Sequence, residues 1–402
     1  MPGSSYQITF NGQAASPDFY NAVIKLEVEE NMDLPGAVQI NLPVSRSQSG
    51  DLAYVSDSTL QPMVNVAVVI NPPSGGVANG PDGDDPTSIA GALGGAAGGG
   101  SGPQCIFDGY ILSHKLHLES GTTNSTLTVW GQDASWLMNL TENVKEWVDM
   151  TDADAANSIF GDYGITPDDS NTDDDSPSHT EDGHTLMQRA SDIQFLRNLA
   201  RRNGKICRIA CADQPGMRTG YFSSPKLDGD PVATLSITDP TLWTVNSLDL
   251  EFDVSRPSSV IARQALFTDS DEDGANADTS DSGLPLLSDR GLAEFAGKSM
   301  TVLLTAPVDD AGELSLRAQS LLREAGWFVR CEGESDLARL GTVLRVGTIV
   351  ELQGAGALHS GKYLVWSVRH SIGPVDHTMK FVLVRNAVGS PPGGLSRLAG
   401  QL

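Results

Sequence analysis

Three aspartates at alternate positions form the feature of this sequence that comes closest to a metal site. Asp269, Asp271 and Asp273 precede a glycine and match the opening of a calcium loop, in which side-chain oxygens surround the ion. The twelfth position of such a loop is Ser280, where a bidentate glutamate is needed, and no convincing helix flanks the segment. An acidic surface loop over 269–281 therefore explains the pattern better, and we predict no metal ligand.

The histidines also lack metal-ligand spacing. His179 and His184 are five residues apart in a polar loop that contains a proline and a glycine, whereas a helical ligand pair needs a spacing of four. We predict that both are solvated. His114 and His117 fall on opposite faces of a predicted strand and cannot share a metal, and His370 is explained as local structure near a strand end.

Motifs of common active sites are missing from the sequence. It has no G-x-S-x-G elbow, no G-x-x-x-x-G-K-[ST] loop and no H-E-x-x-H pair. The glycine-rich segment 91–102 does not join a strand to a helix, so it is not a phosphate loop. With 51 acidic residues, pairs of carboxylates occur by chance and carry no weight. We therefore predict no enzyme and neither catalytic nor cofactor-binding residues.

Four cysteines are too few for a disulfide scaffold; they are Cys105, Cys207, Cys211 and Cys331. In KICRIAC, two of them alternate with polar or small residues as on a strand with one apolar face. No further cysteine or histidine lies nearby in the sequence, so we predict that these thiols fill the core.

The fold class expected is β-rich α+β. Residues 1–135 form a first β unit, because apolar and polar residues alternate in YQITFNG, FYNAVIKLEVEENMDLPGAVQINLP, MVNVAVVI, CIFDGYILSHKLHLES and STLTVWGQD. Short strands of this kind are typical of a sandwich or barrel. Within this unit, 71–103 is rich in Gly, Ala, Pro, Asp and Ser and is predicted to be a disordered or loosely ordered insertion.

A mixed α/β region is expected over 136–234. Helical spacing occurs in DASWLMNLTENVKEWV, in DADAANSIFGDYGI and most clearly in SDIQFLRNLARRNG. In the last segment, Ser191 and Gln194 are predicted to form a capping box, and Asn203 with Gly204 ends the helix. Its arginines are expected to face solvent or a partner; they are Arg197, Arg201 and Arg202.

A second β unit with one helix is expected over 235–390, followed by a loose tail over 391–402. Its strands are SLDLEFDV, SVIARQALF, KSMTVLLTAPV, GWFVRCEGE, TIVELQG, GKYLVWSVRHSI and HTMKFVLVRN, and ELSLRAQSLLREAG has helical period. The first and last units are alike in kind, which hints at an internal duplication.

The charge of the chain excludes some functions. Its 402 residues carry a net charge of -25, a field that repels nucleic acid, so we predict no direct nucleic-acid binding. Aspartate dominates the acidity, which fits adaptation to high salt and acidic surface loops equally. No apolar run reaches about 18 residues, and the start lacks a secretion signal, so we expect no membrane segment and synthesis in the cytoplasm.

Three groups of segments resemble the phage late control D family, in the expected order. DGHTLMQRA and SDIQFLRNLARRNG are similar to its T/S-D-x-x-F-L-x-x-L-A-x-x-x-G pattern, and WGQDASWLMN resembles the end of its first barrel. LRAQSLLREAGWFVRCEGE, LRVGTIVELQG and GKYLVWSVRH look like its second barrel. The family includes the tail hubs of contractile phages and the hub part of type VI secretion spike proteins.

The resemblance implies two tube-like β-barrel domains joined by the small α/β region, assembled as a homotrimer. It implies a baseplate or tail-tip hub that adapts a sixfold tail tube to a threefold spike, in a virion tail or an injection-system particle. The partners would be tail tube proteins, a separate central spike, other baseplate proteins and a tape-measure protein. The spike is expected to be separate because no repetitive β-helix follows the barrels in this sequence.

Two other functions remain open from the residues alone. A β-rich secreted hydrolase of polysaccharide or peptidoglycan would show a cleft with two carboxyls of shifted pKa. A calcium-dependent adhesion module would bind calcium stoichiometrically and be stabilised by it.

Overall fold

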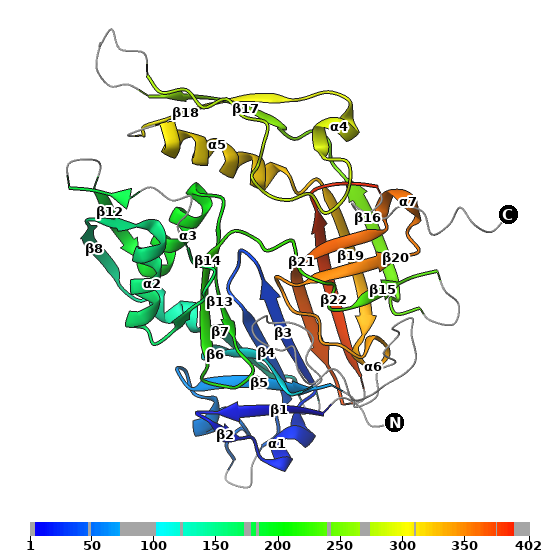
Figure 1. The fold of residues 1–402 in the computed structure, drawn as a ribbon. Helices are drawn as coiled ribbons and strands as arrows, with labels where there is room; N and C mark the ends of the chain where they lie inside the picture. Colours follow the sequence, from blue (N-terminus) through cyan, green and yellow to red (C-terminus); the bar gives the residue numbers. More distant parts are fainter. Residues whose placement is uncertain are drawn as a thin grey trace, which may run out of the picture.

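Most strands of this β-rich protein belong to one large, mainly antiparallel sheet (Figure 1). The structure, a computed structural model, describes residues 5–46, 50–72, 102–120, 124–172, 178–181, 185–238, 243–265, 274–308, 311–374 and 376–389. The predicted insertion over 71–103 falls mostly outside these residues, as do Asp269, Asp271 and Asp273 of the predicted acidic loop and the predicted tail over 391–402.

Thirteen of the described strands form the large sheet. Its main path is β16-β19-β22-β21-β3-β4-β7-β6-β5-β1-β2, and β20 pairs with β21 and with β15. The strands are β1 (Ser5–Phe10), β2 (Gln13–Ala14), β3 (Lys25–Asn31), β4 (Ala37–Pro43), β5 (Asn65–Asn71), β6 (Gln104–His117), β7 (Thr126–Asp133), β15 (Thr234–Ser236), β16 (Ser247–Phe252), β19 (Val329–Asp336), β20 (Ile349–Gln353), β21 (Gly361–Ile372) and β22 (His377–Arg385).

Alternating apolar residues set the register of the central strands. Leu26 of β3 lies opposite Ile40 of β4, and Ile40 in turn lies opposite Val129 of β7. All three side chains are buried, so the same face of three neighbouring strands supplies the core. A shift by one residue would turn this face to solvent, which is why the alternation specifies the pairing.

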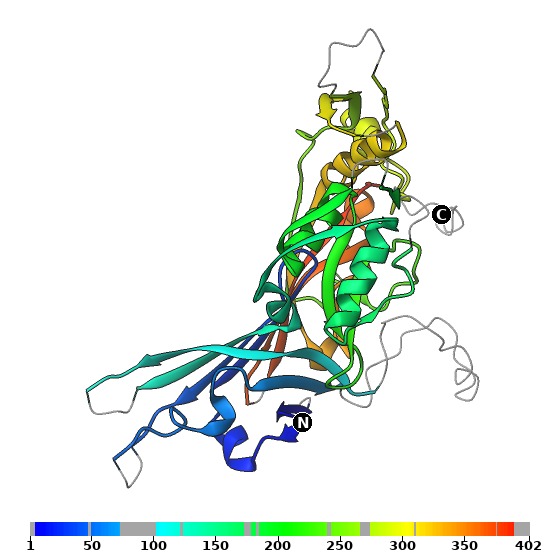
Figure 2. The ribbon, with the colours of Figure 1, turned by 90° about the vertical axis from the view of Figure 1, so that its left-hand side faces the viewer.

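The two predicted β units meet within the sheet rather than forming separate layers. β3, from the first unit, pairs antiparallel with β21, from the second (Figure 2). Among the described residues, the pairing follows an open path and does not close on itself. The two tube-like barrels therefore remain a prediction, whereas the β-rich fold with a large antiparallel sheet is confirmed.

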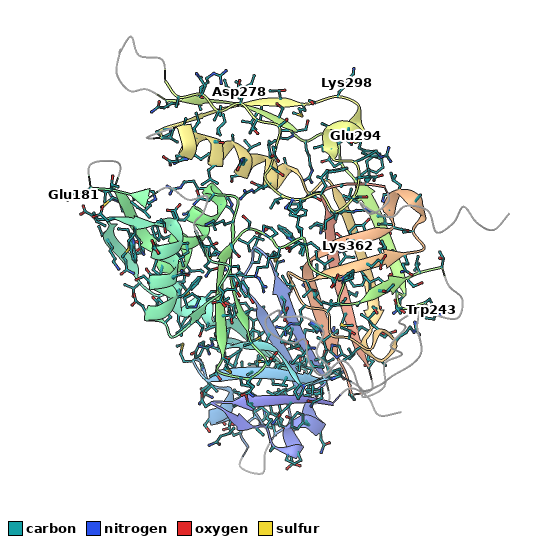
Figure 3. The ribbon with its side chains drawn as sticks, viewed as in Figure 1. Glu181, Trp243, Asp278, Glu294, Lys298 and Lys362 are labelled. Atoms are coloured by element: carbon teal, nitrogen blue, oxygen red, sulfur yellow. The ribbon has the colours of Figure 1, made fainter. Side chains whose placement is uncertain are left out.

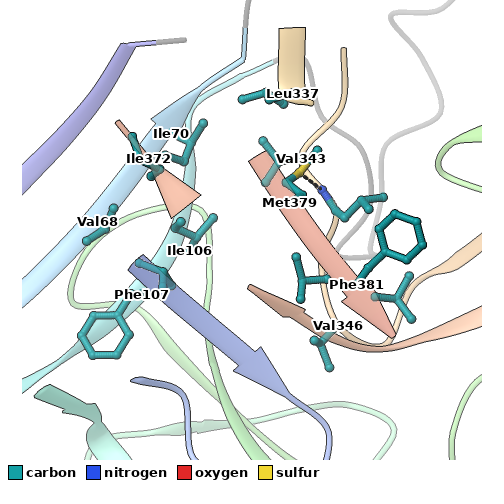
Figure 4. Packing of buried hydrophobic residues seen from close by; sticks show 14 of the residues in the cluster. Val68, Ile70, Ile106, Phe107, Leu337, Val343, Val346, Ile372, Met379 and Phe381 are labelled. Carbon is teal, nitrogen blue, oxygen red and sulfur yellow. Dashed lines mark hydrogen bonds between the residues drawn. The ribbon is translucent and has the colours of Figure 1, made fainter. Parts of the chain in front are cut away.

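One apolar core serves both ends of the chain. Val68, Ile106 and Phe107 of the N-terminal strands belong to the same buried cluster as Ile372 and Phe381 of the C-terminal strands (Figure 4). A thioether accepts a hydrogen bond within this cluster, since the Leu344 N–H lies 3.5 Å from the Met379 sulfur. The shared core explains why the two β units are not independent bodies.

The middle region packs helices against short strands. It consists of β8 (Glu142–Trp147), β9 (Met150–Thr151), α2 (Asp152–Asp162), β10 (Thr166–Pro167), β11 (Ser178–His179), β12 (Leu186–Ser191), α3 (Asp192–Arg202), β13 (Ile206–Cys211) and β14 (Arg218–Ser223). The predicted helices over α2 and α3 are confirmed, and α3 ends at Asn203 and Gly204 as predicted. These helices bury their apolar sides in a second core.

A third small core lies at the end of the molecule opposite α1 (Pro17–Ala22) (Figure 1). There β17 (Ser259–Gln264) and β18 (Thr301–Ala306) pair in parallel, and α5 (Ala311–Ala325) packs on β17 through Leu314, Ala318 and Leu322. The remaining short helices are α4 (Leu292–Ala296), α6 (Leu337–Leu340), α7 (Gly356–His359), η1 (Ser58–Leu60) and η2 (Ala134–Asn139).

The strand predicted to begin at Phe19 is wrong in its first part. α1 occupies Pro17–Ala22, and its first turn is fixed by Ser16, whose hydroxyl accepts a hydrogen bond from the Phe19 N–H at 3.2 Å. Proline at the start of the helix fits because its missing N–H would have no partner there. Ser16 and Pro17 therefore indicate the start of a helix in the sequence. The alternation of apolar and polar residues that follows them favoured a strand instead.

The helix predicted through Trp136, Leu140, Val144 and Trp147 is also wrong. The segment forms the short 3-10 helix η2 and then β8, which pairs antiparallel with β12 from Leu186 opposite Trp147 onward. Trp147 is buried, whereas Val144 is 80% exposed, as expected for a strand with one covered face. Pairing with β12, which follows almost 40 residues later, overrides the helical spacing.

A buried pair of histidines joins β21 to β22. His370 Nδ1 lies 3.1 Å from His377 Nε2, and the His370 side chain is fully buried. Burial, and then the neighbouring His377, lowers the pKa of His370 well below its usual value. Burial alone lowers the pKa of His377 to about 4. Both rings are therefore neutral in the folded protein at neutral pH.

The histidine pair predicts loss of stability in acid. The pKa of His377 is about 4 folded but about 6.5 unfolded, so the unfolded chain binds more protons and the free energy of unfolding falls as pH drops from about 6.5 to 4. Between pH 7 and pH 5 this loss is about 2 kcal/mol for one such histidine. We expect His377→Gln to reduce the loss by about that amount, measured by urea unfolding at each pH.

The control is His117→Asn, because His117 is exposed and pairs with Glu119 at the surface. This variant should lose stability between pH 7 and pH 5 as the wild type does, because it leaves the pair of His370 and His377 intact. An unchanged pH dependence in His377→Gln would contradict the assignment of acid sensitivity to the buried pair.

Candidate functional site: the junction of β3 and β21 and its cleft

The junction of β3 and β21 is reinforced by two ion pairs on adjacent residues. Glu29 and Glu30, at the end of β3, bind two arginines from the C-terminal part of the chain. At the surface, Arg369 Nη2 lies 2.6 Å from Glu29 Oε2. In a more buried position, Arg345 Nε lies 2.7 Å from Glu30 Oε1.

Burial makes the second pair the stronger constraint. The side chains of Glu30 and Arg345 are 13% and 16% exposed, against 35% and 55% for Glu29 and Arg369. The Val346 N–H also donates to the second oxygen of Glu30 at 3.2 Å. Although burial works against its charge, the Glu30 carboxylate raises the pKa of the Arg345 guanidinium. Losing either partner would leave a poorly solvated charge.

A cleft of about 320 Å³ opens beside this junction. Its walls come from α3, β13, α5, β16, β19, β21 and β22, and from Asp33, which follows β3. Asp33 and Trp366 line it on the junction side, where the Met32 N–H donates to the Trp366 carbonyl at 3.0 Å. The cleft therefore lies where all three predicted regions of the chain meet.

Close packing of α3 against α5 shapes one wall of the cleft. Gly204, at the end of α3, has φ +63°, and a side chain there would meet Ser320 and Arg323 of α5. Ser320 donates from its hydroxyl to the Arg201 carbonyl at 2.8 Å. Arg323 is buried and donates to the carbonyls of Asn203 and Ser282. The glycine predicted to end the helix is thus also required for this contact.

Cations outnumber carboxylates in the cleft, although the chain as a whole is strongly acidic. The cations are Arg197, Arg201, Lys205, Arg256, Arg323 and Arg330, and the carboxylates are Asp33, Glu251, Asp253 and Glu324. Burial raises the pKa of Asp33, and the charge of Arg201 opposes this rise. The arginines of α3 that were expected to face solvent or a partner thus include two that line this cleft, Arg197 and Arg201.

Exposed charged side chains are spread over the outer parts of the molecule. Glu181, Asp278, Glu294 and Lys298 lie away from the centre of the fold (Figure 3). Trp243 is also exposed, and the Arg339 guanidinium lies 3.2 Å from the centre of its ring.

His179 is not solvated, which corrects the prediction from the sequence. It is 8% exposed, and its Nε2 lies 2.8 Å from the fully buried Asp152 carboxylate. Arg202 and Asn203, at the end of α3, bind the same carboxylate. Against the cost of burial, His179 and then Arg202 lower the pKa of Asp152. This network fixes α2 to α3. The pairing of β11 with β9 positions His179, and this pairing leaves no pattern in the sequence around His179 from which it could have been predicted.

The predicted capping box at the start of α3 does not form. Ser191 occupies the capping position, but its hydroxyl donates to Asn139 Oδ1 at 2.6 Å instead of bonding to the helix. Gln194 donates to the same oxygen at 3.1 Å. A tertiary partner from η2 therefore replaces the local cap.

The other histidines have separate structural contacts. His114 Nε2 lies 2.5 Å from the Leu60 carbonyl, and His117 pairs with Glu119 at the surface. The interpretation of His370 as local structure was incomplete, since it belongs to the buried pair with His377. His184 lies outside the described residues.

Of the two thiols of KICRIAC that were predicted to fill the core, Cys207 is buried and Cys211 keeps part of its surface exposed. Cys207 is buried in the core of the middle region, and burial raises its pKa to about 12. Cys331 is buried in the main core, where burial likewise raises its pKa to about 12. Neither forms a reactive thiolate at neutral pH.

Neither a metal cluster nor a membrane span is found in the described parts of the chain. No three His, Cys, Asp or Glu side chains there are placed to hold a metal ion. None of the helices in those parts has the length and apolar character needed to cross a bilayer.

The fold is similar to that of solved phage tail and secretion proteins. A 43 kDa tail protein of prophage MuSo2 from Shewanella oneidensis superimposes with a TM-score of 0.64 at 14% identity, over 96% of this chain and 100% of that one. A tail protein from Neisseria meningitidis MC58 gives 0.61 at 13% identity, over 96% and 98%. An E. coli protein described as a type VI secretion component similar to T4 tail proteins gp27 and gp5 gives 0.52 at 14% identity, over 97% and 80%.

Sequence comparison gives one family match. The sequence pattern of the family described as "Alg8 N-terminal domain" matches residues 95–374. No curated protein sequence matches the chain.

The neighbouring glutamates of β3 provide a matched test of the junction. We expect Glu30→Gln to lower the free energy of unfolding by about 3 kcal/mol, because it leaves Arg345 buried without its counter-charge. Glu29→Gln should cost less than about 1 kcal/mol, because its partner is largely exposed. Urea unfolding of both variants measures the difference, and equal costs would contradict the role assigned to the buried pair.

Proposed function

We propose that this chain, which belongs to the family described as the Alg8 N-terminal domain, is a structural hub of a phage tail or contractile injection system. The observation that carries the proposal is the fold, which matches two phage tail proteins over nearly the whole of both chains. The segments that resemble the late control D family support the same function and lie in the same order as in that family.

The hub would work by converting symmetry. In this proposal, residues 1–135 and 235–390 form two similar tube-like units, and 136–234 is an attached α/β region. Three chains would then present six units in a ring, so that one side fits a sixfold tail tube and the other a threefold spike. The antiparallel contact between β3 and β21 supports this arrangement, because it already joins one unit to the next within the chain.

Charge is consistent with a tube through which acidic material passes. A net charge of -25 repels a nucleic acid, which limits its adhesion to the hub. The partners we propose are two further copies of the chain, tail tube proteins, a separate central spike, other baseplate proteins and a tape measure. The particle would be a virion tail or an injection-system baseplate, assembled after synthesis in the cytoplasm.

A hydrolase is the second candidate, because the cleft contains a carboxyl of raised pKa. Asp33 lies there with Glu324, and the charge of Glu324 contributes to the rise. Paired carboxyls in a cleft are a requirement of glycoside hydrolysis. The cations that surround Asp33 favour ionised carboxylates instead, which is why a structural role is the stronger proposal.

The mass of the purified protein in solution tests the hub directly. We expect a species of about three times the chain mass of 42.5 kDa in light scattering and native mass spectrometry. A concentration series separates weak from stable association. A monomer at every concentration reached, and also in the presence of a purified spike or tube partner, would contradict the trimer.

Release of soluble sugars from purified peptidoglycan tests the alternative. We expect no release above that of a buffer blank, because the cations that line the cleft favour ionised carboxylates over the protonated acid that hydrolysis needs. The matched variants are Asp33→Asn and Glu324→Gln. Release by the wild type that is lost in both variants would favour the hydrolase over the hub.

A further inference from the structure

Two cysteines from different regions of the fold meet where β13 contacts β6. Cys105 lies near the start of β6 in the large sheet, and Cys211 is the last residue of β13 in the middle region. The Cys211 sulfur lies 2.9 Å from the Cys105 carbonyl oxygen. Both side chains pack with Ala67 and Val69 of β5 in one small apolar cluster.

The surrounding contacts hold the two strands in place. Asp108, three residues after Cys105, is buried and accepts a hydrogen bond from Arg218 Nη2 at 2.8 Å. The same carboxylate accepts a second bond from the Gly216 N–H at 2.6 Å. Since Arg218 begins β14 and Cys211 lies opposite it in the β13–β14 hairpin, this ion pair fixes the position of Cys211 against β6.

The other two cysteines provide an internal contrast. Cys207 and Cys331 are buried in two different cores, each without a second cysteine in the same core. All four cysteines are free in the structure. Cys211 alone keeps part of its surface exposed, and the remaining three are buried.

We propose that Cys105 and Cys211 form a disulfide by exchange with a small-molecule disulfide such as oxidised glutathione. The Cys211 thiolate attacks one glutathione sulfur, forms a mixed disulfide and releases one reduced glutathione. The Cys105 thiolate then attacks the Cys211 sulfur, forms the intramolecular bond and releases the second reduced glutathione. Each thiol loses one proton, and the two electrons reduce the glutathione disulfide.

The reaction is slow at neutral pH and faster in base. A hydrogen bond with Cys105, and then burial, raises the pKa of the Cys211 thiol well above 9.0. Arg345 opposes this, since its Nη2 lies 3.9 Å from the sulfur. Because only the thiolate attacks, the rate should rise with pH from 7 to 9. The reducing poise of the cytoplasm keeps the thiols reduced there, and the bond forms where the surroundings are oxidising.

The bond would fasten the middle region to the large sheet. It would close a loop between residues 106 positions apart, a length at which cross-linking restricts the unfolded chain strongly. This consequence rests on the proposed function in one respect only: a particle component leaves the cytoplasm and meets oxidising conditions. The chemistry itself is independent of the assembly.

The experiment treats the purified full chain with oxidised glutathione at pH 7 and pH 9, then maps its cysteines by peptide mass spectrometry without reduction. We expect a Cys105–Cys211 linked peptide, more quickly at pH 9, and a rise in Tm of about 5 °C that dithiothreitol reverses. Cys211→Ser should abolish the link and the rise in Tm. Cys207→Ser is the matched control and should leave both unchanged.

Two outcomes would overturn the proposal. Cys211 carrying glutathione without any linked peptide would mean that Cys105 does not reach it. No modification of Cys211 in the folded protein at pH 9, with full modification in urea, would mean that its thiol is closed to exchange. Either result leaves the mass measurement of the trimer unaffected, so failure of the disulfide and failure of the hub are distinguishable.

Discussion

The pairing of β3 with β21 is the contact on which the rest of the fold depends. It joins residues about 340 positions apart, from Leu26 opposite Ile372 to Asn31 opposite Ser367. Through it, the N-terminal and C-terminal strands share one sheet and one core, and the cleft forms beside its end. Such a contact forms only after a long loop has closed, so the shared sheet is expected to be a late event in folding.

The elements of the sheet were predictable because their signal is local. Leu26 and Val28 alternate with charged residues along β3, as do Val38 and Ile40 along β4 with polar ones, and a turn connects the two strands. The pairing of β3 with β21 has no such signal, because each strand needs only a partner with an apolar face and many strands offer one. The sequence therefore indicates a β-rich fold and leaves its connections open.

Apart from the missed helix α1, whose start has a local signal, the errors share one physical cause: a tertiary partner overrides a local preference. The residues of β8 have helical spacing but pair with β12, and Ser191 has the position of a cap but bonds to Asn139. His179 lies in a polar loop but is drawn into the core by the buried carboxylate of Asp152. None of the partners is adjacent in sequence, so neither spacing nor composition could identify them.

The buried charges explain how an acidic chain keeps one arrangement of its parts. Glu30 binds Arg345 across the junction, Asp108 binds Arg218 between the sheet and the middle region, and Asp152 binds Arg202 within it. A carboxylate without its arginine would stay buried and unpaired in any shifted packing, at a cost of several kcal/mol.

Apolar contacts alone tolerate such shifts more easily, because many apolar surfaces fit one another roughly. The buried carboxylates at the boundaries between regions thus disfavour incorrect packing of these regions more than they add to the free energy of unfolding. In a subunit whose proposed task is to present two units at a fixed spacing, the penalty against a wrong arrangement is the property that matters.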